Sequence, residues 1–167
     1  MISKGWLPLT VADLPIVDYI ADTIHTDLPE RTEVFAEKIK LFPQGCFKFV
    51  CDNQIAGYGI SHPWKLFSIP ALDSFLVRCP DDPDCLYIHD VAILQKARGH
   101  NAAADYVSII KAVAHRLLIP TLACVSVYGT DVLWSRCGFE EIHSQELLEK
   151  LCSYGGSAKY MIARLAL

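Results

Sequence analysis

Apolar residues recur along this chain with two periods, the helical period of about 3.6 residues and the strand period of two. The first helical segment begins at Thr10, which is followed three positions later by Asp13, the pairing of a capping box. Its apolar face repeats at helical spacing: Leu14, Val17, Ile20, Ala21 and Ile24. By contrast, residues 46–62 form two strand-like runs divided by an Asp52-Asn53 turn, the pattern of a hairpin.

The complete pattern predicts strands and helices along the whole chain. In order, these are a strand at 6–9, helices at 10–24 and 29–41, a hairpin at 46–62, a strand at 86–94, a helix at 102–118, a strand at 122–128, a short helix at 131–137, and strands at 139–142 and 159–167. Pro63 is expected to end the second hairpin strand, and a short helix is expected near 72–77 in an otherwise irregular stretch. This order predicts an α/β (α+β) fold, in which a mixed central sheet carries helices on both faces.

Length and composition favour one folded domain spanning residues 1–167, with 52% hydrophobic and 20% charged residues. No apolar run approaches the roughly 20 residues of a membrane helix, and the N-terminus lacks a signal-peptide pattern, so we expect a cytoplasmic protein that does not bind membranes. The net charge of -4 argues against binding to nucleic acid. The seven cysteines have irregular spacings without a zinc pattern, so no metal site is expected.

The segment HDVAILQKARGHNAA, from His89 to Ala103, joins the end of a predicted strand to the start of a helix. A helix start presents unpaired N–H groups and the positive end of the helix dipole, a combination that binds phosphate groups. Gly99 permits close approach of the backbone, Asn101 tolerates a left-handed conformation, and Arg98 adds positive charge. Since the segment contains neither a Walker loop nor a GxGxxG dinucleotide motif, it predicts another kind of pyrophosphate site.

This segment, followed further along the chain by VLWSRCGFEEI, resembles the acetyl-CoA-binding core of the GNAT (GCN5-related) N-acetyltransferase superfamily. In that family a strand of the type V-x-P-x-x-R-G-x-G-x-G leads into the pyrophosphate turn, and Y-x-x-x-G-F closes the cofactor site. The resemblance covers residues 86–142 by motif, and the upstream order of strand, two helices and hairpin agrees with it. It implies a largely antiparallel sheet, acetyl-CoA as co-substrate, and direct acetyl transfer to an amine in a ternary complex.

The resemblance assigns cofactor binding to a strand, a turn and one aromatic residue. These are Val91, Ala92 and Ile93, then Arg98, Gly99, His100, Asn101, Ala102 and Ala103, and finally Trp134. Three positions depart from the family: Gln95 replaces its usual proline, Asn101 its middle glycine, and Trp134 a tyrosine that often protonates the leaving thiolate. Because an indole N–H is not a usable acid, that role is vacant at position 134, whereas Asn101 should preserve the turn.

Acetyl transfer requires a deprotonated amine, a polarised thioester carbonyl and a thiolate that can leave. The resemblance implies that backbone N–H groups polarise the carbonyl where the central strand bulges, around Val91 to Ile93. His89 and Asp90 lie where relatives often carry an acidic pair, and either is a candidate for general base or for substrate binding. On a regular strand the two side chains face opposite sides, so only one reaches the substrate unless the bulge intervenes. Alternatively, one of them is a buried polar residue that bridges strands.

Tyr128 is the nearest candidate to protonate the thiolate, with Ser126 as a weaker one and water as a third source. Tyr128 is also compatible with a surface position in a Tyr-Gly turn. His62 and Trp64, at the end of the hairpin strand, are candidates to line the acceptor pocket, or else they pack in the turn. The other histidines outside the motif are interpreted as surface or helix-end residues: His25, His115 and His143.

Three functions are compatible with these residues. The first is an acetyl-CoA-dependent N-acetyltransferase that acts on a primary amine of a small molecule or peptide, either as a monomer or as a homodimer. The second is a catalytically impaired acyl-CoA-binding module with a regulatory or interaction role, which Trp134 and Asn101 favour. The third is an interaction protein without a ligand. The sequence leaves the identity of the amine and the length of the acyl chain open.

Overall fold

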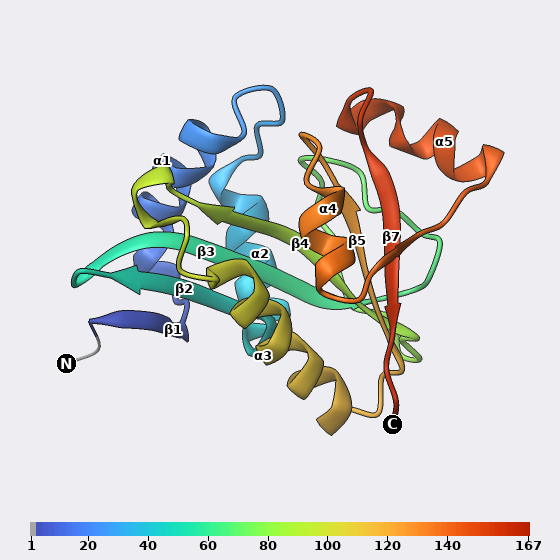
Figure 1. Ribbon diagram of the computed structural model, residues 1–167, viewed down its shortest axis with the longest axis horizontal. Helices are drawn as coiled ribbons and strands as arrows, with labels where there is room; N and C mark the ends of the chain where they lie inside the picture. The colour runs from blue at the N-terminus through green and yellow to red at the C-terminus, as the bar shows by residue number, and fades with distance from the viewer. Residues whose placement is uncertain (1–2) are drawn as a thin grey trace.

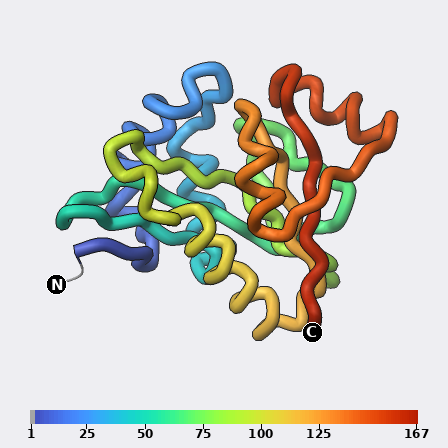
Figure 2. Tube along the Cα trace, viewed as in Figure 1, coloured from blue at the N-terminus to red at the C-terminus, as the bar shows by residue number. Residues whose placement is uncertain are grey.

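The structure, a computed structural model, describes residues 3–167 and places helices on both faces of a twisted sheet (Figure 1). In chain order the elements are β1 (Lys4–Pro8), α1 (Leu14–Ile24), α2 (Thr32–Leu41), β2 (Cys46–Cys51), β3 (Gln54–Trp64), β4 (Cys85–Ile93), α3 (Ala102–Arg116), β5 (Thr121–Ser126), α4 (Asp131–Arg136), β6 (Glu140–Glu141), α5 (Gln145–Leu151) and β7 (Lys159–Arg164). Figure 2 follows the chain from β1, at one edge of the sheet, to β7, near the other.

One seven-stranded sheet organises the fold, with the strand order β1-β2-β3-β4-β5-β7-β6. All neighbouring strands are antiparallel except β4 and β5, which run parallel. This parallel pairing covers only Leu86 to Ile88 of β4 and Leu122 to Cys124 of β5, although both strands continue beyond it. The two strands therefore separate at their carboxyl ends (Figure 1). The predicted mixed, largely antiparallel sheet is confirmed.

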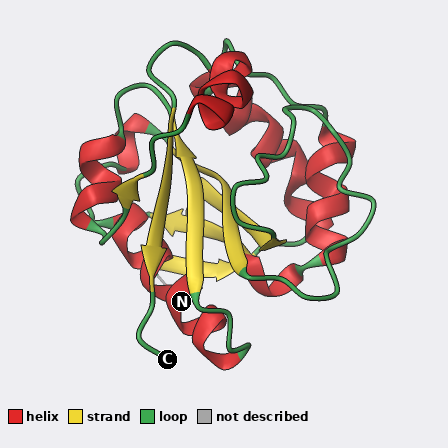
Figure 3. Ribbon diagram, turned by 90° about the vertical axis from the view of Figure 1, so that its right-hand side faces the viewer, coloured by secondary structure: helices red, strands yellow, loops and turns green. Residues whose placement is uncertain are grey.

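The two faces of the sheet carry separate layers of core, and helices lie to either side of the sheet in Figure 3. On one face, α1 and α2 cover β3 and β4, and Val17 and Phe35 are buried in this layer. On the other face, α3 covers β4 and β5 through the buried side chains of Tyr106 and Ile110. None of the helices in residues 3–167 is long and apolar enough to cross a membrane.

Local sequence signals that act through the backbone are confirmed. Asp52 and Asn53 have φ values of 51° and 60°, the left-handed backbone that a tight hairpin turn requires at both central positions. At the start of the first helical segment, the Thr10 N–H donates to Asp13 Oδ2 over 2.9 Å, as in a capping box. Both signals lie within a few residues of the chain, so no distant contact is needed to produce them.

The second helix begins at Thr32 and not near position 29, because distant contacts hold the preceding residues in extended backbone. The Glu30 carboxylate accepts a hydrogen bond from the Asp73 N–H over 3.0 Å. Arg31 donates from its N–H and its Nε to Asp73 Oδ1, over 2.8 and 3.0 Å. These bonds stabilise an extended segment that local helical propensity alone would have continued as helix.

The helix expected at 72–77 is wrong for a related reason. Asp73 and Val77 have φ values of 53° and 69°, which no α-helix contains. The N–H groups of Leu76 and Val77 donate to the Glu37 carboxylate of α2 over 2.6 and 3.0 Å. Side chains of α2 and of the loop before it thus replace the hydrogen bonds that a helix would have made within the segment.

Two further differences concern the end of β3 and the helix α5. β3 continues through Pro63, which pairs with Leu86 of β4, so the expected strand end at Pro63 is wrong. Beyond Ile60, β3 has β4 as its strand partner and no longer pairs with β2, so a residue without an N–H is tolerated there. The helix α5 was not predicted, although Ser144 caps it by accepting the Leu147 N–H over 3.1 Å.

Candidate active site

The separation of β4 from β5 opens a cavity of about 530 Å³. Its wall runs from the turn at Arg98, along β4 from His89 to Ile93, to the loop after α1 at His25 and Glu30. Side chains from the segment that follows β5 complete the lining. The turn at Arg98 and several titratable side chains consequently share one continuous space.

A β-bulge lies at His89 in β4. Ile60 of β3 pairs with Asp90, whereas the next residue, Ser61, pairs with Ile88, so His89 is the extra residue. The bulge shifts the side-chain alternation by one position. His89 and Asp90 therefore both line the cavity, although they are consecutive residues of one strand.

The bulge was expected around Val91 to Ile93, and the structure places it at His89 instead. Main-chain N–H groups of Val91 and Ile93 are nevertheless unpaired with β3, because of the direction in which they point. The Leu94 N–H donates to Ala56 O of β3 over 2.8 Å. Because main-chain groups of a strand alternate in direction, the N–H groups of Val91 and Ile93 point away from β3, toward the side from which β5 has separated. Both residues line the cavity. These N–H groups can donate hydrogen bonds to a carbonyl oxygen there.

The turn between β4 and α3 has the backbone of an anion-binding loop. Gly99 has a φ of 84°, and a Cβ placed there would meet no atom within 4 Å, so the surrounding space is open. Asn101 precedes α3 with a φ of 59° and a ψ of 23°, in the left-handed region that asparagine tolerates. Arg98 Nε donates to Ile93 O over 3.1 Å. The first N–H groups of α3 lack helical acceptors, so this turn can hold a pyrophosphate.

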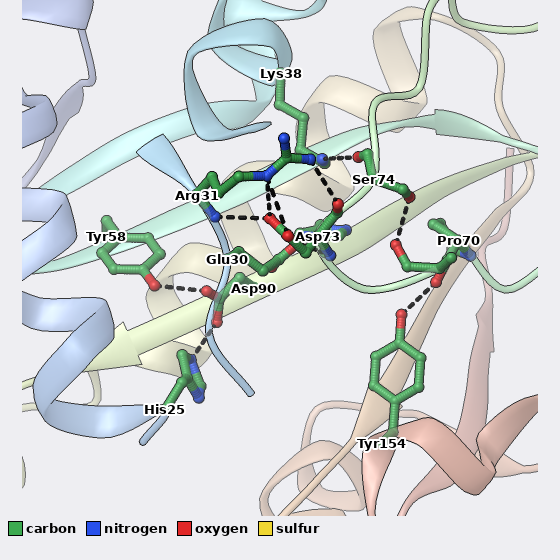
Figure 4. Close-up of polar contacts among 12 residues, drawn as sticks. His25, Glu30, Arg31, Lys38, Tyr58, Pro70, Asp73, Ser74, Asp90 and Tyr154 are labelled. Carbon is green, nitrogen blue, oxygen red and sulfur yellow. Dashed lines mark hydrogen bonds and ion pairs between the residues drawn. The ribbon is translucent and has the colours of Figure 1, made fainter. Parts of the chain in front are cut away.

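A chain of hydrogen bonds lies at the other end of the cavity, and Figure 4 shows the part of it formed by Tyr58, Asp90 and His25. Asp90 Oδ1 lies 2.7 Å from His25 Nε2, and Asp90 Oδ2 accepts from the Tyr58 hydroxyl over 2.5 Å. On its other side, His25 Nδ1 lies 3.3 Å from the Tyr128 hydroxyl, and the two rings stack with centroids 5.8 Å apart. The side chains of His25 and Asp90 are only 13% and 9% exposed, so water screens their interaction weakly.

These contacts set the protonation of the chain. Burial by itself lowers the pKa of His25, but the Asp90 carboxylate, assisted by Glu30, raises that pKa above its ordinary value. Burial, followed by the negative charge of Asp90, raises the pKa values of the Tyr58 and Tyr128 hydroxyls. Both tyrosines are therefore protonated at neutral pH, and the imidazolium form of His25 persists to a higher pH than in a free histidine.

His89 is bonded to a different carboxylate. Its Nε2 lies 3.0 Å from Glu30 Oε1, and the two side chains are 2% and 6% exposed. Burial would raise the pKa of Glu30, but the charge and hydrogen bond of His89, together with the Asp73 N–H, lower it below its ordinary value. His89 thus lies at the cavity with its ring directed toward Glu30, which limits its access to a substrate.

His62 and Trp64 do not line the cavity, and their expected position in the acceptor pocket is corrected. His62 is fully buried, and burial above all lowers its pKa to about 3. Its ring contacts those of Trp64 and His89, with centroid distances of 5.2 and 5.8 Å. Both residues pair with residues of β4 that precede His89, on the side of the bulge away from Val91 and Ile93.

The other predicted residues differ in exposure. Trp134 is 7% exposed, packs on Phe139 with ring centroids 5.3 Å apart, and lines the cavity, as do Ala92, Ala102 and Ala103. His100 is exposed and outside the lining, with Nδ1 3.4 Å from Lys4 Nζ. Ser126 is buried, and its Oγ lacks a hydrogen-bond partner among residues 3–167.

No family model matches this chain, and no curated protein matches it in sequence. Its architecture nevertheless matches solved structures over almost the whole chain. Naa50 from Arabidopsis thaliana, in complex with the bisubstrate analogue CoA-Ac-MVNAL, is 11% identical with a TM-score of 0.71, and the match covers 99% of this chain and 100% of that one. Ard1 from Thermoplasma volcanium is 10% identical with a TM-score of 0.71 and the same coverage of both chains. GphF, a GNAT-like decarboxylase in complex with isobutyryl-CoA, is 13% identical with a TM-score of 0.77, covering 97% and 100%.

This chain has the GNAT fold. Identities this low establish the architecture and leave the reaction to be argued from the site itself. Within the GNAT fold, the cavity lies where β4 and β5 separate, next to the turn that the sequence motif identified. In residues 3–167, no group of three or more His, Cys, Asp or Glu side chains is arranged to hold a metal ion.

Two residues of this cavity carry no signal in the sequence. His25 was interpreted as a surface or helix-end residue, and it does follow the last turn of α1, but its side chain is turned inward to Asp90, 65 positions away. Glu30 belongs to no motif of the sequence, and its partner His89 is 59 positions away. No local pattern announces either pairing, because each depends on a loop meeting a strand that lies far along the chain.

Proposed function

We propose that this protein is an acyl-CoA-dependent N-acetyltransferase, formed by residues 1–167 as one domain, that transfers an acetyl group from acetyl-CoA to a primary amine of a small molecule or peptide. The observation that carries the proposal is the single cavity that joins the Arg98 turn to the His25–Asp90 pair along the unpaired edge of β4. Solved relatives by fold include CoA complexes, which supports the choice of co-substrate.

Each part of the cavity meets one requirement of direct transfer in a ternary complex. The turn holds the pyrophosphate, and the N–H groups of Val91 and Ile93 stabilise negative charge on the thioester oxygen. Asp90 and Tyr128 supply acid-base groups at the reacting end, while His89 fixes Glu30 behind them. The thioester contributes the activated acetyl group, and the protein contributes position and proton transfer.

We expect acetyl-CoA and CoA each to bind with a Kd on the order of micromolar in calorimetric titration. Arg98→Ala should weaken binding by about tenfold or more, because a charge-assisted contact with the pyrophosphate is lost. At Asn101, glycine should preserve binding and valine should weaken it, since a β-branched residue resists left-handed backbone. Lys40→Ala, an exposed change on α2, is the control. Absence of binding heat with both ligands would contradict the proposal.

The acceptor end of the cavity favours a single amine carried on an apolar group. Apolar and aromatic residues line this end: Ile24, Leu28, Leu72 and Tyr154. Its two carboxylates, Glu30 and Asp90, are each bonded to a histidine, so neither is free to bind a second cationic group. We therefore expect peptides with an apolar first residue to be acetylated about tenfold faster than spermidine. Release of CoA thiol across a panel of amines measures this, and a preference for spermidine would count against it.

A second candidate is an acyl-CoA-binding module with impaired catalysis. It is favoured by Trp134, whose indole cannot serve as an acid, and by the complete bonding of Asp90 and Glu30. A GNAT-like decarboxylase of the same fold also illustrates that this architecture is not confined to acetyl transfer. In this case acetyl-CoA binds, but no amine of the panel is acetylated.

A further inference from the structure

Tyr128 reaches the cavity from a strained turn. It follows β5 with a φ of 56°, and Gly129 after it has a φ of 73°. Non-glycine residues adopt left-handed backbone rarely, and they keep it where the surrounding structure requires it. The turn brings the half-exposed Tyr128 ring onto the face of His25, at the end of α1, more than a hundred positions away in sequence.

The hydrogen bonds of this pair have a defined direction when His25 is protonated. Both ring nitrogens then carry a proton, so Nε2–H donates to Asp90 Oδ1 and Nδ1–H donates to the Tyr128 oxygen. The remaining oxygen of Asp90 accepts from Tyr58. Because the Tyr128 oxygen accepts from His25, the hydroxyl proton of Tyr128 is free to be donated into the cavity.

On the basis of the acetyltransferase function above, we propose that Asp90, His25 and Tyr128 form a proton-delivery chain to the thiolate that leaves during acetyl transfer. Tyr128 is the catalytic acid of this chain. His25 is a positioning residue that orients Tyr128 and returns a proton to it, and Asp90 holds His25 in place by accepting a hydrogen bond from its Nε2–H. The chain fills the role that the Trp134 indole cannot perform.

The proton and electron pairs balance in the following way. The amine nitrogen forms the new C–N bond, and the C–S bond breaks with its electron pair going to sulfur. Tyr128 gives its hydroxyl proton to sulfur, and His25 Nδ1–H gives its proton to the Tyr128 oxygen. The acylated nitrogen loses one proton to water, and His25, which lines the cavity, regains one from water. No net proton and no further reactant are consumed.

The surroundings of His25 stabilise its charged form. The groups that face it are Asp90 from β4, Glu30 from the loop before α2, and Tyr128 from the segment after β5. The two carboxylates raise the pKa of His25 despite its burial. The protonated chain is therefore present below that raised pKa and is lost as the pH rises through it.

The first experiment measures kcat for Tyr128→Phe, His25→Asn and the double variant, with acetyl-CoA and the best amine of the panel. Each single change is expected to lower kcat by about 10- to 100-fold and to leave the Kd for CoA unchanged. Since both residues act as one unit, the double variant should be no slower than Tyr128→Phe. Additive losses, or a kcat unchanged by both single variants, would overturn the chain.

The second readout is pH dependence, which a purely structural role would not alter. Asparagine retains a donor toward Tyr128 but does not ionise, so the ratio of wild-type kcat to His25→Asn kcat should fall as the pH rises. A ratio independent of pH contradicts the proposal. Tyr19→Phe and His115→Asn, both at exposed positions, are the matched controls.

A third measurement requires no acceptor. In an NMR titration of the imidazole signals, the midpoint of His25 should lie above the ordinary histidine value of about 6.5, and Asp90→Asn should lower it. A His25 midpoint below that ordinary value, or one that Asp90→Asn leaves unchanged, would overturn the chain. If the wild type neither binds CoA nor acetylates any amine, the acetyltransferase function itself fails. If it does both while the His25 and Tyr128 variants remain fully active, only the proton-delivery chain fails.

Discussion

Replacing Asp90 by asparagine is expected to lower kcat/KM for acetyl transfer by about 100-fold, no more than the loss of Tyr128 itself, while CoA still binds. Asp90 accepts hydrogen bonds on both oxygens, from His25 and from Tyr58. Asparagine offers one oxygen and one NH2 group, so a donor must face one of these two partners. His25 also loses the negative charge that favours its protonated form. Steady-state kinetics on the variant, with calorimetric titration of CoA in parallel, measure both effects.

Asp22→Asn is the matched control for this substitution. Asp22 is exposed on α1, three positions before His25, so the same change of charge occurs close in sequence but outside the cavity. Its kcat/KM should be close to that of the wild type. If Asp90→Asn were as active as Asp22→Asn, the reacting end of the cavity would have to lie elsewhere.

Breaking the Glu30–His89 pair is expected to lower the free energy of unfolding by about 3 kcal/mol, because removal of one partner leaves the other buried without its hydrogen bond. Glu30→Leu also removes the acceptor of the Asp73 N–H, and with it one tether of the loop between β3 and β4. The double variant Glu30→Leu/His89→Leu should recover much of the loss, since neither polar group then remains unpaired. Urea denaturation followed by circular dichroism measures each free energy.

The same pair predicts a pH dependence of stability. The pKa of Glu30 is lowered in the folded protein, so its contribution is complete above the ordinary value of 4.5 and disappears as the pH falls through the lower, folded value. In Glu30→Leu, the free energy of unfolding should therefore depend less on pH in this acidic range. The exposed pair of Glu146 and Lys150 on α5 is the comparison, and Glu146→Gln should change stability by less than about 0.5 kcal/mol. Equal effects of the two substitutions would remove the structural role assigned to Glu30.

Signals that act over a few residues were readable from the sequence. The Asp52-Asn53 turn and the Thr10–Asp13 cap gave the expected backbone, and most strands and helices lie within a few residues of their predicted ranges. Asn101 has the left-handed backbone that was expected, since asparagine is one of the few residues other than glycine that tolerate it. The left-handed turn before α3 and the GNAT architecture could therefore be predicted from the sequence.

The chemistry of the cavity was decided by tertiary structure. His89 is an extra residue of β4 without a pairing partner in β3, so the side chains of β4 change faces of the sheet at this position. No residue type in the strand specifies such a bulge. The pairing of Asp90 with His25, and of His89 with Glu30, joins segments about sixty positions apart. Propensity and periodicity describe neighbours along the chain, whereas the partner of a buried charge is chosen by the packing of α1 and the loop before α2 against the sheet. The sequence thus determined the fold and the left-handed turn before α3, and only the packed structure determined which histidine faces which carboxylate.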